Sequence, residues 1–132
     1  MVILNISILI VLIITNALVD WYRIEVRRQS FTNTMYLLKS LLRGLVMVAN
    51  LLVYYIHNPF DFWFSIAHIA TQSAIFWILF DPALSYLRKK PNPWFYLGKT
   101  APTDTIFNNI REQYAIKLLY LVVSLTILII TI

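Results

Sequence analysis

Residues 2–19 read VILNISILIVLIITNALV, an apolar segment long enough to cross the hydrocarbon core of a bilayer as one helix. The few polar side chains that interrupt this segment are small and uncharged. The residues that follow, DWYR at 20–23, are charged and aromatic, which is typical of the level of the lipid headgroups. We therefore predict a first membrane span that ends near residue 19.

Three further apolar segments predict membrane spans at about 35–56, 60–80 and 115–132. The second and third spans are separated only by residues 57–59, where Pro59 lacks a backbone N–H and disfavours helix at the residue before it. These two spans should therefore form a tight antiparallel hairpin. We predict an all-α membrane protein, with residues 1–132 forming a single transmembrane domain built as a bundle of four transmembrane helices.

The composition of the whole chain agrees with this architecture. Of its 132 residues 60% are hydrophobic, and the mean hydropathy is +0.72, whereas a soluble domain is roughly 45–50% apolar. The chain has no cysteine, which excludes disulfides and thiolate metal sites. A core built by this chain is therefore expected to lie inside lipid.

The distribution of Lys and Arg predicts the orientation in the membrane. The 20–34 connection carries three of these residues and the 83–114 connection carries five, whereas the 57–59 turn and the residues before the first span carry none. Connections rich in Lys and Arg stay on the cytoplasmic side. We predict an integral protein of the bacterial inner membrane, with connections 20–34 and 83–114 cytoplasmic and both termini outside.

The 83–114 connection is predicted to be an irregular, basic and aromatic loop. Its segment at 88–103 reads RKKPNPWFYLGKTAPT, in which prolines and a glycine favour loop structure and the aromatic triplet favours the bilayer surface. Thr103 or Asp104 is a candidate N-cap of the helix that leads into the last span. Three residues of this loop are candidates to bind anionic lipid headgroups or a partner protein, namely Arg88, Lys89 and Lys90.

Charged residues also occur within or at the ends of the predicted spans. Lys39 and Arg43 lie one turn apart, and the carboxylates of Asp20 and Asp81 are the plausible partners of Arg43. A guanidinium group matches a phosphate bidentately, so Lys39, Arg43 and Asp81 form a candidate site for an anion or a lipid headgroup. The alternative is an ion pair whose role is to fix helix packing.

Uncharged polar residues form a stripe on each helix of the predicted hairpin. Counting outward from residue 59 places Asn50 level with His68, with Gln72 one turn further along. We predict that Asn50, His68 and Gln72 form hydrogen bonds between the two helices. The alternative is a hydrated path along the axis of the bundle.

Motifs of catalysis are missing from the sequence. It contains no GxSxG, HExxH or GxxxxGK pattern, so we expect no enzyme activity, no metal site and no cofactor. The excess of 11 Lys and Arg over 6 Asp and Glu is explained by cytoplasmic connections. No nucleic-acid-binding module is recognisable, and we expect no nucleic-acid partner.

Short motifs occur near the membrane ends of the predicted spans. They are FDP at 80–82, Leu87-Arg88, FYLGKT at 95–100, Asp104, and Trp21 with Arg23. In these motifs the chain resembles small uncharacterised membrane proteins of Bacteroidota phages and mobile elements. That family has no assigned activity, so the resemblance implies a phage or mobile-element accessory role and assigns no functional residue.

Two functions are compatible with the sequence. The first is a non-catalytic membrane protein that acts by assembling with itself or with a protein partner, for example as a holin-like or host-membrane factor. The second is a small transport or lipid-binding protein that holds an anion or an anionic headgroup with its membrane-embedded Arg, Lys and Asp residues. A solvent-filled cavity that reaches Arg43 would favour the second function, whereas a dry, close-packed bundle would favour the first.

Overall fold

The computed structural model describes residues 2–95 and 109–132. It contains four long α-helices, and no strand occurs in this part of the chain, so the predicted all-α fold is confirmed. The helices are α1 (Val2–Trp21), α2 (Asn33–Tyr55), α3 (Phe62–Leu87) and α4 (Ile110–Thr131). A π-helical turn, η1 (Tyr22–Val26), extends α1, and a 3-10 turn, η2 (Pro93–Phe95), follows α3.

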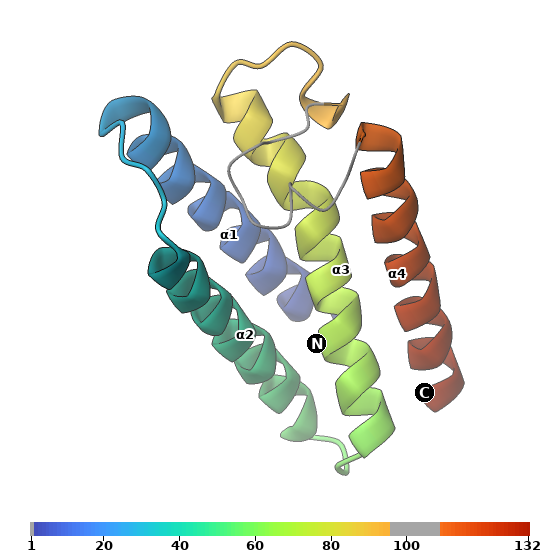
Figure 1. The fold of residues 1–132 in the computed structure, drawn as a ribbon. Coiled ribbons are helices and arrows are strands. Elements are labelled where there is room, and N and C mark those ends of the chain that lie inside the picture. Colours follow the sequence, from blue (N-terminus) through green and yellow to red (C-terminus); the bar gives the residue numbers. More distant parts are fainter. Residues whose placement is uncertain (1, 96–108) are drawn as a thin grey trace.

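The four helices run alternately up and down, with both termini at the same end of the bundle (Figure 1). Helix α3 is central, because it contacts each of the other three helices. Helix α1 also packs against α2, whereas the main contacts of α4 are with α3. The end of the bundle opposite the termini carries the last turns of α1 and α3 and the first turns of α2 and α4.

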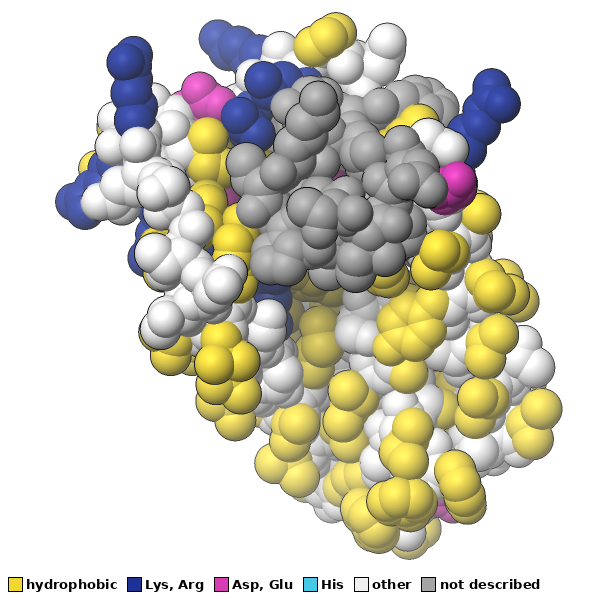
Figure 2. Space-filling model, in the orientation of Figure 1, with side chains coloured by type: hydrophobic (Ala, Val, Ile, Leu, Met, Phe, Trp, Pro, Cys, Tyr) yellow, Lys and Arg dark blue, Asp and Glu magenta, His cyan; other side chains and the backbone are white. Residues whose placement is uncertain are grey.

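Each of the four helices is long and apolar enough to cross a membrane. In Figure 2 Lys and Arg side chains gather at the end opposite the termini, whereas hydrophobic side chains are spread over the remaining surface. Apolar side chains face outward on every helix. Their exposure would cost free energy in water but not in lipid. The chain is therefore a small integral membrane protein.

Three helices begin at a side chain that caps the backbone. Thr32 accepts a hydrogen bond from the Met35 N–H at 3.3 Å, Asp61 from the Phe64 N–H at 2.7 Å, and Asn109 from the Glu112 N–H at 2.9 Å. These are the residue types that N-cap positions favour. The N-cap predicted at Thr103 or Asp104 lies outside the described residues, and α4 begins at Ile110.

Helix α3 continues further than the sequence predicted. Pro82 lies inside the helix and is buried, and the helix ends only at Leu87. The connection predicted to begin at residue 83 therefore begins at Arg88. Proline removes one backbone hydrogen bond from a helix, and in α3 the remaining bonds and the packing of its neighbours are sufficient to keep the helix intact.

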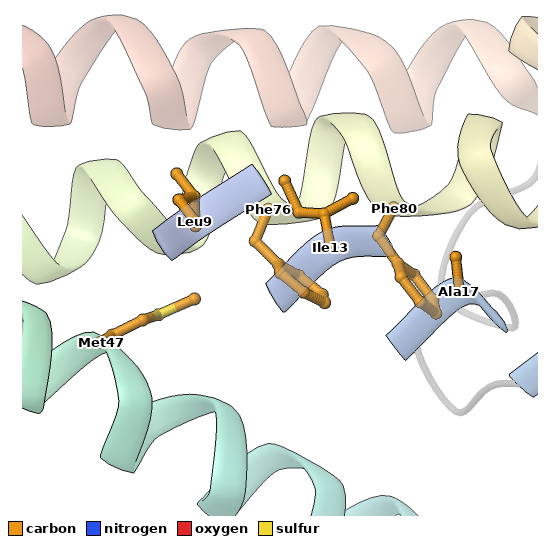
Figure 3. Close-up of a cluster of buried hydrophobic side chains, with 6 residues drawn as sticks. All are labelled: Leu9, Ile13, Ala17, Met47, Phe76 and Phe80. Carbon is orange, nitrogen blue, oxygen red and sulfur yellow. The ribbon is translucent and has the colours of Figure 1, made fainter. Parts of the chain in front are cut away.

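The hydrophobic core lies where α1, α2 and α3 meet (Figure 3). The rings of Phe76 and Phe80 stack with their centroids 5.2 Å apart, and they lie against side chains of α1. Each buried member of this core is less than a tenth exposed. The buried members are Leu9, Ile13, Ala17, Met47, Phe76 and Phe80.

Candidate functional site

The charged side chains inside the bundle form two separate groups. In the first, Asp20 at the end of α1 lies between the cations of Lys39 and Arg43 from α2. Lys39 forms a hydrogen-bonded ion pair with Asp20, and an Arg43 terminal nitrogen lies 3.9 Å from the other Asp20 oxygen. With one carboxylate and two cations, this group carries a net charge of +1.

Arg43 is held by uncharged groups as much as by Asp20. Its Nε donates to the Oδ1 of Asn16 at 3.0 Å, and its guanidinium lies 4.7 Å from the ring centroid of Phe76 and 4.8 Å from that of Phe80. A guanidinium over an aromatic face is stabilised by the ring quadrupole. The cation of Arg43 is thereby fixed against the hydrophobic core.

Of the two carboxylates predicted as plausible partners of Arg43, Asp20 lies at ion-pair distance from it, as predicted, and Asp81 has another partner. Asp81 forms an ion pair with Lys117 of α4, with 2.5 Å between Asp81 Oδ2 and Lys117 Nζ. Lys117 also donates to the backbone oxygen of Trp77 at 3.2 Å, and its side chain is only 1% exposed. The charged residues predicted as one cluster, Lys39, Arg43 and Asp81, therefore belong to two sets of ion pairs, with Lys39 and Arg43 on Asp20 and Lys117 on Asp81.

Lys117 was not among the site residues predicted from the sequence. The signal was available, because a lysine within an apolar span needs a counter-charge at the same depth. Both Asp81 and Lys117 lie toward the end of the bundle opposite the termini. Choosing between Arg43 and Lys117 as the partner of Asp81 required the rotation of each helix, which the sequence does not provide.

Asn50, Gln72 and His68 are joined in a chain of hydrogen bonds between α2 and α3. Asn50 Nδ2 donates to Gln72 Oε1 at 2.8 Å, and Gln72 Nε2 lies 2.8 Å from His68 Nδ1. The direct partner of Asn50 is thus Gln72, one helical turn beyond the residue that counting from the turn placed opposite it. Gln72 connects Asn50 to His68.

The end opposite the termini carries the basic residues of both long connections that the structure describes. Arg88 Nε donates to Glu25 Oε1 at 2.8 Å, which links the turn after α1 to the end of α3. Five residues, 88–92, then lead from α3 to η2, and we call this segment the basic arch because it contains Arg88, Lys89 and Lys90. Lys89 and Asn92 adopt positive φ angles of 52° and 51°, which reverse the chain sharply.

An apolar pocket of about 570 Å³ lies between α1 and α3, next to the residues that flank the basic arch. Leu87, which precedes the arch, and Pro93, which follows it, both line this pocket, which we call the α1–α3 groove. Its volume lies in the range typical of ligand pockets, ~300–1,000 Å³. The walls are almost entirely apolar and include Ile13, Ala17, Leu79, Ala83 and Trp94.

Neither a metal-binding cluster nor a similar protein points to a function for these residues. Within residues 2–95 and 109–132, no group of three His, Cys, Asp or Glu side chains is placed to hold a metal ion. Comparisons of the chain with protein families, curated proteins and solved structures found no match. The class that the fold defines is thus a small four-helix membrane protein, and function has to be argued from its own residues.

Proposed function

We propose that this membrane protein binds an anionic phospholipid at its basic end and acts without catalysis. The observation that carries the proposal is the position of the basic arch beside the α1–α3 groove. An acyl chain fits an apolar groove, and a headgroup phosphate is attracted by Lys and Arg near the membrane surface, with ~1 kcal/mol for each residue. The proposal keeps the anionic lipid of the second function expected from the sequence, but moves it from the membrane-embedded Arg, Lys and Asp residues to the basic arch.

The backbone of the arch supports the same proposal. A left-handed conformation costs about 1–2 kcal/mol for most residues other than glycine and asparagine, and Lys89 adopts it, as does Arg28 in the other basic connection. Local strain of this kind is concentrated at binding sites. The strain is explained if the sharp reversal serves to keep the basic arch beside the groove, which Leu87 and Pro93 line on either side of the arch.

The interior cations have a different role in this proposal. Lys39, Arg43 and Lys117 each contact a carboxylate of the bundle, and Arg43 is in addition fixed by Asn16 and two aromatic rings. Arg43 does not line the α1–α3 groove. We assign these side chains to helix packing, and the headgroup to the arch.

The proposal includes an orientation. The basic end would face the cytoplasm of a bacterial cell, where the surface of the inner membrane is rich in anionic lipid, and both termini would face outward. Anionic headgroups would then be available at the same side of the membrane as the arch. The orientation and the ligand thus support each other.

The experiment is native mass spectrometry of the full chain released from bilayers of equal phosphatidylglycerol and phosphatidylcholine. We expect one retained phosphatidylglycerol on the wild type. The double variant Lys89→Gln, Lys90→Gln should lose the preference for phosphatidylglycerol by a factor of about 5 to 30, because each lysine contributes about 1 kcal/mol.

The matched control is the double variant Arg27→Gln, Arg28→Gln, which removes the same charge at the same end but outside the arch. It should retain the lipid. An equal loss in the control would mean a general attraction to anionic surfaces and would contradict a site at the arch. A defined homo-oligomer without lipid would instead favour the first function, assembly of a phage-type accessory protein.

A further inference from the structure

A second pocket, of about 390 Å³, lies at the other end of the bundle, near the termini. All four helices contribute to it, and we call it the terminal pocket. Ile132, which directly follows α4, lies at the outer part of the terminal pocket, together with Asn5 near the start of α1. Its inner part reaches Gln72, which lies ten residues into α3, or about 15 Å along the helix.

The terminal pocket combines apolar walls with uncharged polar side chains. Its apolar lining includes Ile6, Phe64 and Leu128, and no Asp, Glu, Lys or Arg lines it. A charged ligand would therefore lack a counter-charge inside the membrane, where an unpaired charge is costly. The lining favours a neutral ligand that is mostly apolar. The polar lining residues are Asn5, Asn50, Tyr54, His68, Thr71 and Gln72.

Several hydrogen-bonding groups of these residues have no partner in the bundle. The buried oxygens Asn5 Oδ1, Asn50 Oδ1 and Thr71 Oγ1 are all without a hydrogen bond. The side chains of Asn50 and Thr71 belong to residues that are 2% and 7% exposed. Buried polar groups of native proteins are nearly always satisfied, so an unsatisfied group calls for a ligand, an ion or water.

The orientation of the Asn50 amide is fixed by its neighbours. Its Nδ2 donates both to Gln72 Oε1 at 2.8 Å and to the backbone oxygen of Asn5 at 3.2 Å. Turning the amide over would place its oxygen against two other oxygens. The unsatisfied group of Asn50 is therefore an acceptor, and it requires a donor.

The same chain of hydrogen bonds makes His68 a donor. Gln72 Nε2 also lies 3.4 Å from the backbone oxygen of Met47, so this nitrogen donates, and His68 Nδ1 must accept from it. The proton of the neutral imidazole is then on Nε2. The residues that line the pocket thus supply an N–H donor and acceptors without donors, and a hydroxyl group can pair with either because it both donates and accepts.

We propose that the terminal pocket binds the hydroxyl head of a neutral amphiphilic molecule, with the apolar body of that molecule against the ends of α1 and α4. All three unsatisfied oxygens have almost no accessible surface as the side chains lie, so the proposal requires a side-chain rotation on binding, which for Thr71 Oγ1 is a rotation about the Cα–Cβ bond. The site is independent of the basic arch. Its ligand is neutral, whereas the ligand of the arch is anionic.

The test compares two probes that share one acyl chain. Monoolein carries two free hydroxyl groups and methyl oleate carries none. The full chain is prepared in lauryldimethylamine oxide, because the hydroxyl groups of maltoside detergents would compete for the site. Native mass spectrometry should show monoolein bound at least fivefold more tightly than methyl oleate, whereas equal binding of the two would overturn the proposal.

Thr71→Val tests the hydroxyl of the protein without changing the size of the side chain. It should weaken monoolein binding about fivefold, the factor that one net hydrogen bond of about 1 kcal/mol supplies, and leave methyl oleate unaffected. The control Thr126→Val removes a hydroxyl of α4 that is exposed and bonded to the Val122 carbonyl, and should bind as the wild type does. Unchanged monoolein binding in Thr71→Val would contradict the proposal.

A second variant removes the space and leaves the polar groups in place. Leu128→Trp enlarges a side chain at the α4 wall of the pocket and should abolish the preference for monoolein. The double variant Lys89→Gln, Lys90→Gln should leave that preference unchanged. The proposal for the terminal pocket and the proposal for the basic arch can therefore be contradicted independently. Retention of the preference in Leu128→Trp would place the monoolein elsewhere on the surface and overturn the proposal.

Discussion

Lys117 and Asp81 form an ion pair whose two members differ greatly in exposure. The Lys117 side chain is 1% exposed, whereas that of Asp81 is 32% exposed. Water or lipid headgroups can therefore reach the carboxylate but not the ammonium group. Removing either partner leaves the other without its counter-charge, and the cost depends on which charge is left.

We predict that Asp81→Asn destabilises the protein more than Lys117→Met does. The first variant leaves a fully buried cation without its carboxylate, and a broken buried pair typically costs about 3–5 kcal/mol. The second variant leaves a carboxylate that can be hydrated. Because this exposure reduces the cost, we expect the free energy of unfolding to fall by only about 1–2 kcal/mol. Chemical unfolding in detergent, followed by circular dichroism, measures both.

The control for this comparison is the double variant Asp81→Leu, Lys117→Met, which removes both charges. Replacement of a buried pair by apolar side chains is often neutral, so it should recover most of the lost stability. Equal losses in the two single variants would show that the exposure of Asp81 has no energetic effect.

The residues of the site illustrate what a sequence can and cannot specify. That Asn50, His68 and Gln72 would lie near one another followed from helical spacing and a short turn, since the hairpin limits the possible registers. The partner of Asp81 did not follow, because α4 is separated from α3 by a long connection. Only the rotation of α4 about its axis decides that Lys117 faces Asp81.

At the scale of the elements, α3 is the helix that departs most from expectation. Four helices could be predicted, because long apolar segments and the scarcity of water in lipid leave helix as the available structure. The residue at which α3 ends could not be predicted, because Pro82 permits either a break or a continuing helix. In the structure Pro82 is buried and lines the α1–α3 groove, and the helix continues for five residues beyond it.

We predict that Pro82→Ala stabilises α3. Proline inside a helix is about 3 kcal/mol less favourable than alanine, and the new N–H can donate to the carbonyl of Ile78, one turn earlier. Loss of the ring from a buried position offsets part of this gain. The free energy of unfolding should rise by about 1–2 kcal/mol, measured by chemical unfolding in detergent.

Pro59→Ala is the matched control, because Pro59 lies in the turn before α3 and interrupts no helical hydrogen bond. It should give no increase in stability. If Pro82→Ala lowers the stability instead, packing of the proline ring against α1 contributes more than the missing hydrogen bond.

At the scale of the whole molecule, the bundle has two chemically different ends. The end with the termini carries the 56–61 turn and the terminal pocket, and the opposite end carries the basic arch and most of the Lys and Arg side chains (Figures 1 and 2). Because the chain has no native cysteine, a single introduced cysteine can report on each end without background.

We predict that Asn58→Cys reacts with a membrane-impermeant maleimide from outside the cell, and that Arg28→Cys reacts only after the membrane is opened. The reason is that basic connections remain on the cytoplasmic side. The cysteine-free wild type is the control for background labelling. Labelling in the reverse order would contradict the orientation and would place the basic arch outside.

The position of Lys117 on the last helix also has a consequence for how the chain is made. Synthesis proceeds from the N-terminus, so α1, α2 and α3, which supply every buried member of the hydrophobic core, are complete before α4 exists. During that interval Asp81 has no lysine opposite it. Lys117 then supplies the positive charge that balances this carboxylate. Insertion of α4 is therefore the step that gives Asp81 its ion-pair partner.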